Sequence, residues 1–532
     1  MDVKFKNLTK SASFKELASY PAPDIKDILS AERVSKCNIK TGIGLDYNYS
    51  AKPVDKKMLG IFQQVANEQQ AVDKYKKVLY GAIMNPGENR MVLHHYTRGT
   101  LDVDHKKDVT KRINLYSKQI ERFSAFAEKV HNGKIKGSTG AKFDTAVQIG
   151  IGGSDLGPRA LYLALKGYMQ TEGKKPLINC EFISNVDPDD ASDVMSRINP
   201  ETTLFIVVSK SGTTQETLTN TALVKSLIKS KSKSIDIAKH MIAVTGKGSP
   251  MENPLEFSNS FYIDDFIGGR YSGTSAVGGV ILSLAFGSDI FKKVLAGAHA
   301  NDKIALQQDI LKNPPLLDAL LSVYDRNILK TTTEAILPYS QALSRFPAHL
   351  QQLIMESNGK SANFKGKPIN YETSPVVFGE PGTNGQHSFY QMLHQGTDIV
   401  PLKFIGFKES QQLCDVNFEE SSCQKKLNAN LAAQITAFAL GQKDENPNKN
   451  FIGGRSSDIL IGKKLTPEAL GSLLAHFENR TMFQGFLWNI NSFDQEGVQL
   501  GKKLANKILS AKSGDANMQE NPVLDAYSAL FT

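Results

Sequence analysis

The rhythm of hydrophobic and polar residues changes near residue 140 of this 532-residue chain. Residues 1 to about 115 show mixed patterns that are mainly helical. From about 140 onward, short apolar runs of strand length alternate with longer stretches in which apolar residues recur at helical spacing. The first strands predicted are Thr145–Ile149, Leu177–Ile183, Leu204–Val208 and Met241–Thr245. A second set is predicted after about residue 330, at Ala335–Leu337, Pro375–Phe378 and Ile399–Ile405.

This alternation predicts an α/β fold with two mainly parallel sheets flanked by helices. We expect a mainly helical N-terminal segment at 1–115 that packs on the large domain, a first α/β domain at 116–288, a second at 289–510 and a C-terminal arm at 511–532. The nearly apolar stretch Ala276–Phe286 is shorter than the roughly 20 residues that a membrane span needs, so it is predicted to be a buried core helix.

Composition narrows the class of protein. The chain is 40% hydrophobic and 22% charged, which is typical of a soluble globular protein and excludes a disordered one. Its net charge of +9 is a mild excess that slightly favours anionic small substrates. The sequence has no dense basic run with interleaved aromatic residues, so we expect no nucleic-acid partner.

The cysteines and the first residues of the chain predict in which cellular compartment the protein works. Cys37, Cys180, Cys414 and Cys423 are scattered, with no CxxC pair, so a reducing cytoplasm is the simplest setting. Residues 1–6 lack the apolar core of a signal peptide, and no membrane partner is expected. The ten histidines include no HExxH motif, so no metal site is predicted.

The clearest local chemistry follows the predicted strand Leu204–Val208. The chain reads SKSGTTQET over Ser209–Thr217, where hydroxyl residues and one glycine turn the chain and a helix begins. Hydroxyl groups and the free N–H groups of a helix N-terminus together form a small anion site. The GxxxxGK[ST] pattern of a nucleotide loop is absent, which favours a phosphate monoester. The alternative is that Thr213 and Thr214 only cap the helix, and this segment alone does not decide between the two.

Two glycine-rich turns supply further candidates. Gly150–Pro158 (GIGGSDLGP) follows a predicted strand, but Asp155 stands where the dinucleotide fingerprint GxGxxG needs glycine, so NAD binding is the poorer interpretation. The turn would let a polar ligand approach the backbone, with Ser154 as a donor; the alternative is a tight strand-to-helix connection. In Gly268–Ser272 (GGRYS), two glycines precede Arg270, which in isolation reads as a surface arginine after a turn.

Three segments carry candidate acid–base or contact groups. Gln352 and Glu356 are four residues apart before an Asn-Gly helix end, so they share a helix face, and Glu356 in a closed site would serve as a general base. His387 follows a predicted strand, at the edge where open α/β sheets bind ligands. Gln495 and Lys502 belong to a polar helical stripe. The alternatives are a solvated glutamate, a structural histidine and a solvated helix face.

Together and in this order, these segments resemble the glucose-6-phosphate isomerase (phosphoglucose isomerase) family. The matching segments are Gly150–Pro158, Ser209–Thr217, Gly268–Ser272, Gln352–Lys360, Gly382–Gly396 and Asn491–Lys502. They extend from residue 150 to residue 502, and the ordered set is far more specific than any one member.

The resemblance implies two SIS-type, flavodoxin-like domains and a homodimer whose active sites are built from both subunits. It implies the reversible isomerisation of D-glucose 6-phosphate and D-fructose 6-phosphate through ring opening and a cis-enediol(ate), in glycolysis and gluconeogenesis. It implies no metal and no other cofactor.

The resemblance also assigns roles by position. The substrate- and phosphate-binding residues that it implies are Gly153, Ser154, Ser209, Lys210, Ser211, Thr213, Thr214, Gln352 and Gln495. Glu356 is implied as the base that moves a proton between C2 and C1, and Arg270 as the cation beside the developing oxyanion. His387 from the neighbouring subunit, supported by Glu216, is implied in ring opening together with Lys502.

The sequence departs from the family pattern in the early stretch Gly87–Thr100, which keeps Arg90 and Val92–His94 but lacks part of the usual surrounding motif, and at two places near implied site residues. Gly273 and Thr274 stand where the family usually has Leu-Trp, which removes bulk behind Arg270. Gln499 stands where the family usually has Glu, which removes a negative charge near Lys502. None of these departures removes a group with an implied catalytic role, so we expect activity.

The sequence leaves two alternative functions open. One is a broader aldose–ketose specificity that includes mannose 6-phosphate, because the sequence does not fix which C2 epimers are accepted. The other is a non-catalytic sugar-phosphate sensor of the same fold. A sensor would need the phosphate loop but no base, so Glu356, Arg270 and His387 argue against it.

Overall fold

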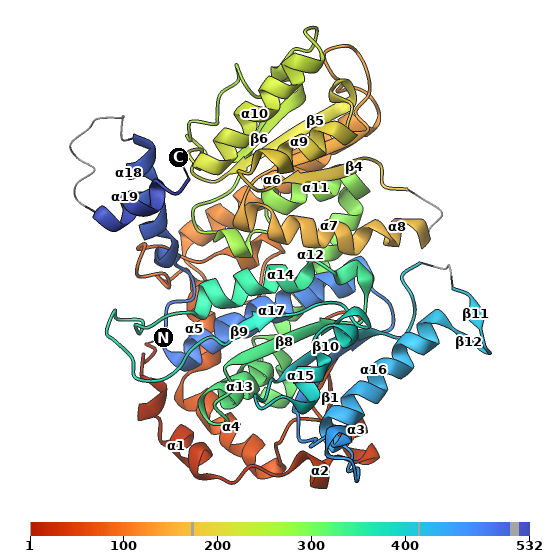
Figure 1. Ribbon diagram of the computed structural model, residues 1–532. Helices are drawn as coiled ribbons and strands as arrows, with labels where there is room; N and C mark the ends of the chain where they lie inside the picture. The colour runs from red at the N-terminus through yellow and green to blue at the C-terminus, as the bar shows by residue number, and fades with distance from the viewer. Residues whose placement is uncertain (1, 172–174, 413–414, 511–520, 532) are drawn as a thin grey trace.

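The computed structural model describes residues 2–171, 175–412, 415–510 and 521–531. Two α/β units lie one above the other, and a group of helices that includes α7, α11, α12, α14 and α17 occupies the space between their sheets (Figure 1). The described α-helices are α1 (Ala12–Ser19), α2 (Ile25–Ile28), α3 (Ala31–Lys36), α4 (Lys56–Glu68), α5 (Ala71–Tyr80), α6 (Lys107–His131), α7 (Leu156–Lys166), α8 (Tyr168–Thr171), α9 (Pro188–Arg197), α10 (Gln215–Lys231), α11 (Ala276–Phe286), α12 (Ser288–Ile304), α13 (Pro314–Asn327), α14 (Phe346–Gln351), α15 (Tyr390–Gln395), α16 (Cys423–Leu440), α17 (Pro467–Trp488), α18 (Gln499–Ser510) and α19 (Pro522–Ser528).

The first sheet has five strands, all parallel, in the order β4-β3-β5-β6-β7. Its strands are β3 (Thr145–Ile149), β4 (Asn179–Ile183), β5 (Thr203–Ser209), β6 (Met241–Thr245) and β7 (Asn259–Tyr262). Because parallel neighbours need crossover connections, α7, α9 and α10 lie between successive strands in the chain. This arrangement brings the carboxyl ends of β3 and β5 side by side.

The second sheet has six strands in the order β1-β2-β13-β10-β8-β9. Its strands are β1 (Asn38–Lys40), β2 (Leu45–Asn48), β8 (Thr333–Pro338), β9 (Val376–Phe378), β10 (Leu402–Phe407) and β13 (Ser457–Gly462). The four strands from β13 to β9 are parallel, and β2 joins β13 in the antiparallel direction. A separate hairpin is formed by β11 (Asn417–Phe418) and β12 (Ser421–Ser422).

The predicted fold class, two mainly parallel sheets flanked by helices, is confirmed. Every predicted strand coincides with or overlaps an observed strand, but β1, β2, β7, β13 and the short hairpin strands β11 and β12 were not predicted. β1 and β7 lie at sheet edges and carry exposed or half-buried polar residues, so neither forms an apolar run. The run of β13 is interrupted by Asp458, which is buried against two lysines. Residue 115, the expected limit of the first segment, falls within α6, and the division into domains stays a prediction.

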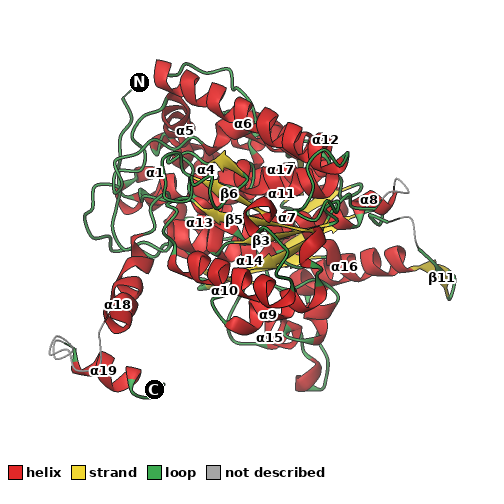
Figure 2. Cartoon of the chain, turned by 90° about the horizontal axis from the view of Figure 1, so that it is seen from above, coloured by secondary structure: helices red, strands yellow, loops and turns green. Residues whose placement is uncertain are grey.

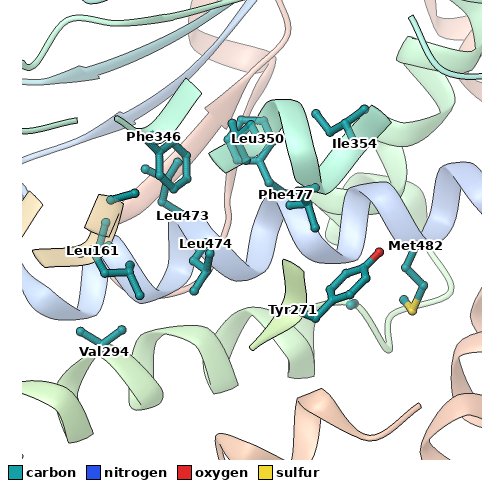
Figure 3. Packing of buried hydrophobic residues seen from close by; sticks show 14 of the residues in the cluster. Leu161, Tyr271, Val294, Phe346, Leu350, Ile354, Leu473, Leu474, Phe477 and Met482 are labelled. Carbon is teal, nitrogen blue, oxygen red and sulfur yellow. The ribbon is translucent and has the colours of Figure 1, made fainter. Parts of the chain in front are cut away.

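Two helices form the centre of the molecule. All eleven residues of α11 are buried, which confirms the predicted core helix. In α17 every residue but Glu468 is buried. Figure 3 shows Leu473 and Phe477 of α17 facing Phe346 and Leu350 of α14, with α12 on the opposite side of α17. Within the described ranges, none of the helices combines the length and the apolar character needed to span a bilayer.

A buried ion network connects α17 to the second sheet. The carboxylate of Asp318 on α13 accepts hydrogen bonds from Lys403 Nζ at 2.8 Å, Arg480 Nε at 2.9 Å and His476 Nε2 at 2.9 Å. Lys403 on β10 also pairs with Asp458 on β13. Burial alone would raise the pKa of Asp318, but Arg480 and Lys403 hold it well below its usual value. The network thus fixes α17 against α13 and the sheet.

We expect Asp318→Asn to lower the free energy of unfolding by about 3–5 kcal/mol, because it leaves Arg480 and Lys403 without a buried counter-charge. Urea unfolding followed by circular dichroism measures the change. Asp289→Asn, which removes an exposed partner of Lys292, is the matched control and should cost less than about 1 kcal/mol. Equal, small effects of the two substitutions would contradict this account.

Candidate active site

The candidate site begins where β3 and β5 end. These strands are in register, with Ile149 beside Val207, so the loops that follow them start next to each other. Polar loops at the carboxyl ends of parallel strands are where open α/β sheets bind ligands.

The loop after β5 has the build of an anion site. The hydroxyls of Ser209 and Thr214 are hydrogen bonded at 2.8 Å, and the N–H of Gly212 donates to Ser209 Oγ at 3.1 Å. Gly212 has φ +70°, which favours glycine at this turn. Thr214 is the first residue before α10, yet its side chain accepts no hydrogen bond from that helix. Of the two interpretations of this segment, the geometry therefore favours free helix N–H groups and an anion site.

The remaining residues of this segment differ in exposure and in their contacts. Ser211 and Thr213 are exposed, and their hydroxyls are hydrogen bonded at 2.9 Å. Glu216 is half-buried in the first turn of α10. Lys210 donates to the carbonyl of Ile267 at 3.1 Å. Burial lowers the pKa of Lys210, and Arg90 lowers it further, while Asp265 and Glu88 oppose the change.

The glycine-rich turn after β3 lets two loops approach each other. A side chain at Gly153 would overlap the carbonyl group of Gly269 and come within 2.6 Å of the N atom of Arg270. Ser272 Oγ lies 3.3 Å from the carbonyl of Gly153, to which it donates. Gly152 has φ +58°, and its ideal Cβ would lie 3.2 Å from Nε2 of Gln352. The turn therefore seats the loop that carries Arg270 and meets the helix that carries Gln352.

Arg270 is 2% exposed, and its guanidinium is fixed by neutral acceptors. Nε donates to Ser357 Oγ at 2.6 Å, and Nη2 donates to the carbonyls of Ser492 at 2.7 Å and Asp494 at 3.0 Å. Tyr271 supports Ser357, because their oxygens are hydrogen bonded at 2.9 Å. Of the three guanidinium nitrogens, Nη1 therefore remains available to face a ligand in the cleft. A surface arginine, the alternative from the sequence, is thereby excluded.

Glu356 faces that remaining nitrogen. Its Oε1 lies 3.4 Å from Arg270 Nη1, and its side chain is 18% exposed. The sequence predicted a regular helix here, but residues Gln352–Glu356 form a π-helix, η9, directly after α14. Such turns are frequent at functional sites. Helical residues end at Asn358, as the Asn-Gly pair predicts.

A cleft of about 780 Å³ opens beside this pair, a volume in the usual range for small-molecule sites. Glu356, Lys360, Asp494 and Gln495 are among its lining residues. Gln495 also lines a second, small cavity together with Lys210 and Arg270. The cleft thus continues from Glu356 toward the residues next to the phosphate loop.

Of the fourteen predicted site residues, nine come together, three (Ser211, Thr213 and Glu216) are exposed or half-buried in the segment from the end of β5 to the first turn of α10, and two lie apart. The described residues around the cleft and its adjoining loops are Gly153, Ser154, Ser209, Lys210, Thr214, Arg270, Gln352, Glu356 and Gln495. The Oε1 atom of Gln352 is buried with no hydrogen-bond partner among the described residues, as a ligand-binding amide would be. His387 and Lys502 are exposed, and neither lines these cavities.

The groups that hold Arg270, and the lysine that contacts one of them, have no signature of their own in the sequence. Ser357, Lys360 and Asp494 lie inside the motif segments, but they were assigned no role. Ser492 and Asp494 act through backbone carbonyls, which carry no side-chain signature. Their position within a motif was the only signal.

The departure at Thr274 has a visible structural role. Thr274 is fully buried, its hydroxyl is hydrogen bonded to Thr97 at 2.7 Å, and it accepts from Arg98 Nε at 3.2 Å. An added side-chain carbon at Gly273 would contact Leu161 at 3.4 Å. Polar contacts and close packing therefore fill the space behind Arg270. In the described part of the chain, no three His, Cys, Asp or Glu side chains are grouped to hold a metal ion.

The comparisons with known proteins all identify the same family. The family model described as phosphoglucose isomerase matches residues 48–525. The glucose-6-phosphate isomerase of Treponema denticola is 55% identical over 521 residues, covering 96% of this chain and 97% of that one. That of Borreliella afzelii is 46% identical over 513 residues, covering 95% and 96%. The crystal structure of a glucose-6-phosphate isomerase from Chlamydia trachomatis matches with a TM-score of 0.91 at 42% identity, covering 99% of both chains.

We expect Gly153→Ala to lower kcat/KM at least about tenfold, because the added carbon pushes the Arg270 loop away from the turn. Steady-state kinetics measure the loss. Gly60→Ala in α4 is the matched control, since nothing lies within 4 Å of its added carbon, and it should leave activity unchanged. Full activity in Gly153→Ala would show that the two loops need not touch.

Proposed function

The chain belongs to the phosphoglucose isomerase family, and we propose that its cleft isomerises glucose 6-phosphate to fructose 6-phosphate, and the reverse, with Glu356 and Arg270 as the central groups. The observation that carries this proposal is the pairing of a buried, fixed guanidinium with a carboxylate that lines the cleft, beside a second cavity that reaches Lys210 of the hydroxyl-rich loop. Such a pair suits a reaction in which a proton moves between carbons while charge develops on oxygen.

The phosphate anchors the sugar away from the reacting carbons. We assign it to Ser209, Ser211, Thr213 and Thr214 together with the first N–H groups of α10. Lys210 contributes positive charge nearby. Binding energy from the phosphate fixes C1 and C2 against Glu356 and so lowers the barrier without touching the reacting atoms. Gly153, Ser154, Gln352 and Gln495 contact the sugar or the ester.

Glu356 and Arg270 carry out the isomerisation step. The carboxylate of Glu356 takes the proton from C2 of the opened aldose and returns it to C1 through a cis-enediol(ate). Arg270 Nη1 faces the oxygens on which negative charge develops, while its other nitrogens stay bound to the protein. Because the guanidinium is already oriented, stabilising the intermediate requires no rearrangement.

Ring opening needs groups that one copy of the chain does not bring together. Lys502 lies on α18, which follows the cleft residues 494–498. His387 precedes α15, and α15 and α18 lie far apart in both Figure 1 and Figure 2. We therefore assign His387 from a second copy, with Glu216 as its support, to act with Lys502 on O1 and O5 of the cyclic sugar.

Helix α18 and the C-terminal arm support assembly as a homodimer. Helices α18 and α19 project from the body and contain no buried residue (Figure 2). Several of their large hydrophobic residues are exposed, among them Leu500, Leu509, Val523 and Tyr527. An amphipathic helix without a cover on its own chain is typical of an interface. Residues 511–520 of the predicted arm lie outside the described residues.

We place the protein in the cytoplasm. Cys37 and Cys180 are buried free thiols, and Cys423 is an exposed one, which suits a reducing compartment. Cys414 lies outside the described residues. The proposed chemistry uses side chains and backbone groups of the protein, with a sugar phosphate as the small-molecule partner.

Turnover of fructose 6-phosphate without added metal, followed by a coupled assay for glucose 6-phosphate, tests the function. We expect Glu356→Gln to lower kcat at least about 100-fold, because it removes the base. The variant should still bind 6-phosphogluconate, since the phosphate loop is intact. Unchanged turnover in Glu356→Gln would refute the assigned base. Wild-type protein that binds the ligand without turnover would instead be a sensor.

Mixed dimers test whether His387 crosses the interface. Glu356→Gln and His387→Ala are each expected to be impaired alone. In a dimer of one copy of each, one site receives both substitutions and the other receives neither. Mixing equal amounts after exchange of subunits should therefore restore about a quarter of wild-type activity. No restoration, with dimers verified by light scattering, would place His387 in the site of its own chain.

A further inference from the structure

The loop after α17 sets the orientation of the Arg270 guanidinium. The carbonyls that accept from Nη2 belong to Ser492 and Asp494, in the segment that joins α17 to η12 (Glu496–Val498). A carbonyl orients a guanidinium only if its own peptide is held in place. What holds this loop therefore sets the direction of Arg270.

The carboxylate of Asp494 is one support of that loop. Its Oδ1 lies 2.5 Å from Lys360 Nζ, and its Oδ2 accepts from Asn491 Nδ2 at 2.7 Å. Lys360 Nζ also donates to the carbonyl of Asp494 at 3.2 Å, the same carbonyl that accepts from Arg270. The side chains of Lys360 and Asp494 are only 18% and 15% exposed, so solvent screens this pair less than a surface pair.

Lys360 is in turn attached to the turn that carries Glu356. The N–H of Lys360 donates to the carbonyl of Asn358 at 2.9 Å, and the N–H of Gly359 donates to the carbonyl of Met355 at 2.8 Å. Only three residues lie between Glu356 and Lys360. The ion pair thus spans from the segment of the carboxylate to the loop that orients the guanidinium.

We propose that Lys360 and Asp494 are positioning residues, whose ion pair holds Glu356 and Arg270 at the separation that proton transfer requires. This inference rests on the proposed function of the cleft. The pair acts through the Asp494 carbonyl on one side and through the Glu356 turn on the other. Two of the three N–H groups of Lys360 are already directed at Asp494.

Both residues also line the cleft, so a direct contact with substrate is the alternative. The two roles differ in kinetics. Loss of a contact made equally in ground state and transition state raises KM, whereas loss of positioning lowers kcat. A positioning role through Arg270 also predicts that the effect disappears when Arg270 is already changed.

The experiment compares Asp494→Asn and Lys360→Met with the wild-type chain, each in the Arg270 and the Arg270→Lys background. We expect kcat to fall about tenfold in either variant, with KM changed less than about twofold. In the Arg270→Lys background the further fall should be less than about twofold. Glu372→Gln, which breaks the exposed Lys330–Glu372 pair of 3.1 Å, is the matched control and should leave kcat unchanged.

Three results would overturn the inference: an unchanged kcat, a raised KM with unchanged kcat, or an equal fall in both backgrounds. Each of these leaves the proposed function intact, provided that the wild-type chain turns over. A wild-type chain without turnover refutes the proposed function instead. Thermal unfolding checks that the variants fold, and Lys360→Met carries the test if Asp494→Asn does not.

Discussion

The site depends on a buried guanidinium that is bound mostly by neutral oxygens. Arg270 joins three segments that are far apart in the sequence: its own loop, the helix end at Ser357 and the loop at 492–494. Burying a charge is costly unless hydrogen bonds satisfy it, and here they do. Backbone carbonyls cannot move without their loops. The guanidinium therefore holds these loops in place, and the loops in turn hold the guanidinium.

The core places those loops. Helix α17 is buried along almost its whole length, and its Arg480 is bound to Asp318 of α13 and to Glu334 of the second sheet. It ends at Trp488, followed by Asn489 in a left-handed conformation. The chain then turns directly into the loop that accepts from Arg270. Rigidity gained from the packing of α17 between α14 and α12 (Figure 3) is in this way transferred to the cleft.

The sequence predicted the strands best where both faces of a strand are buried, as for β5, in which all seven residues are buried. It failed where edge strands are polar, as for β7, or where an ion pair replaces an apolar residue, as at Asp458. For the site, side-chain motifs indicated Ser209, Arg270 and Glu356. The partners of Arg270 could not be predicted, because carbonyl groups are identical in every residue and only the fold aims them.

The π-helix at 352–356 has a consequence for how this region tolerates change in chain length. A widened turn holds one residue more than a regular helix would need to cover the same distance. Removing one residue from it would restore an ordinary helix and leave the secondary structure outwardly intact. The side chains inside the turn, however, would be rearranged, because a regular helix rotates by about 100° at each residue, and the carboxylate would lose its present position opposite its cation. A change of chain length in this turn would therefore abolish activity without unfolding the protein.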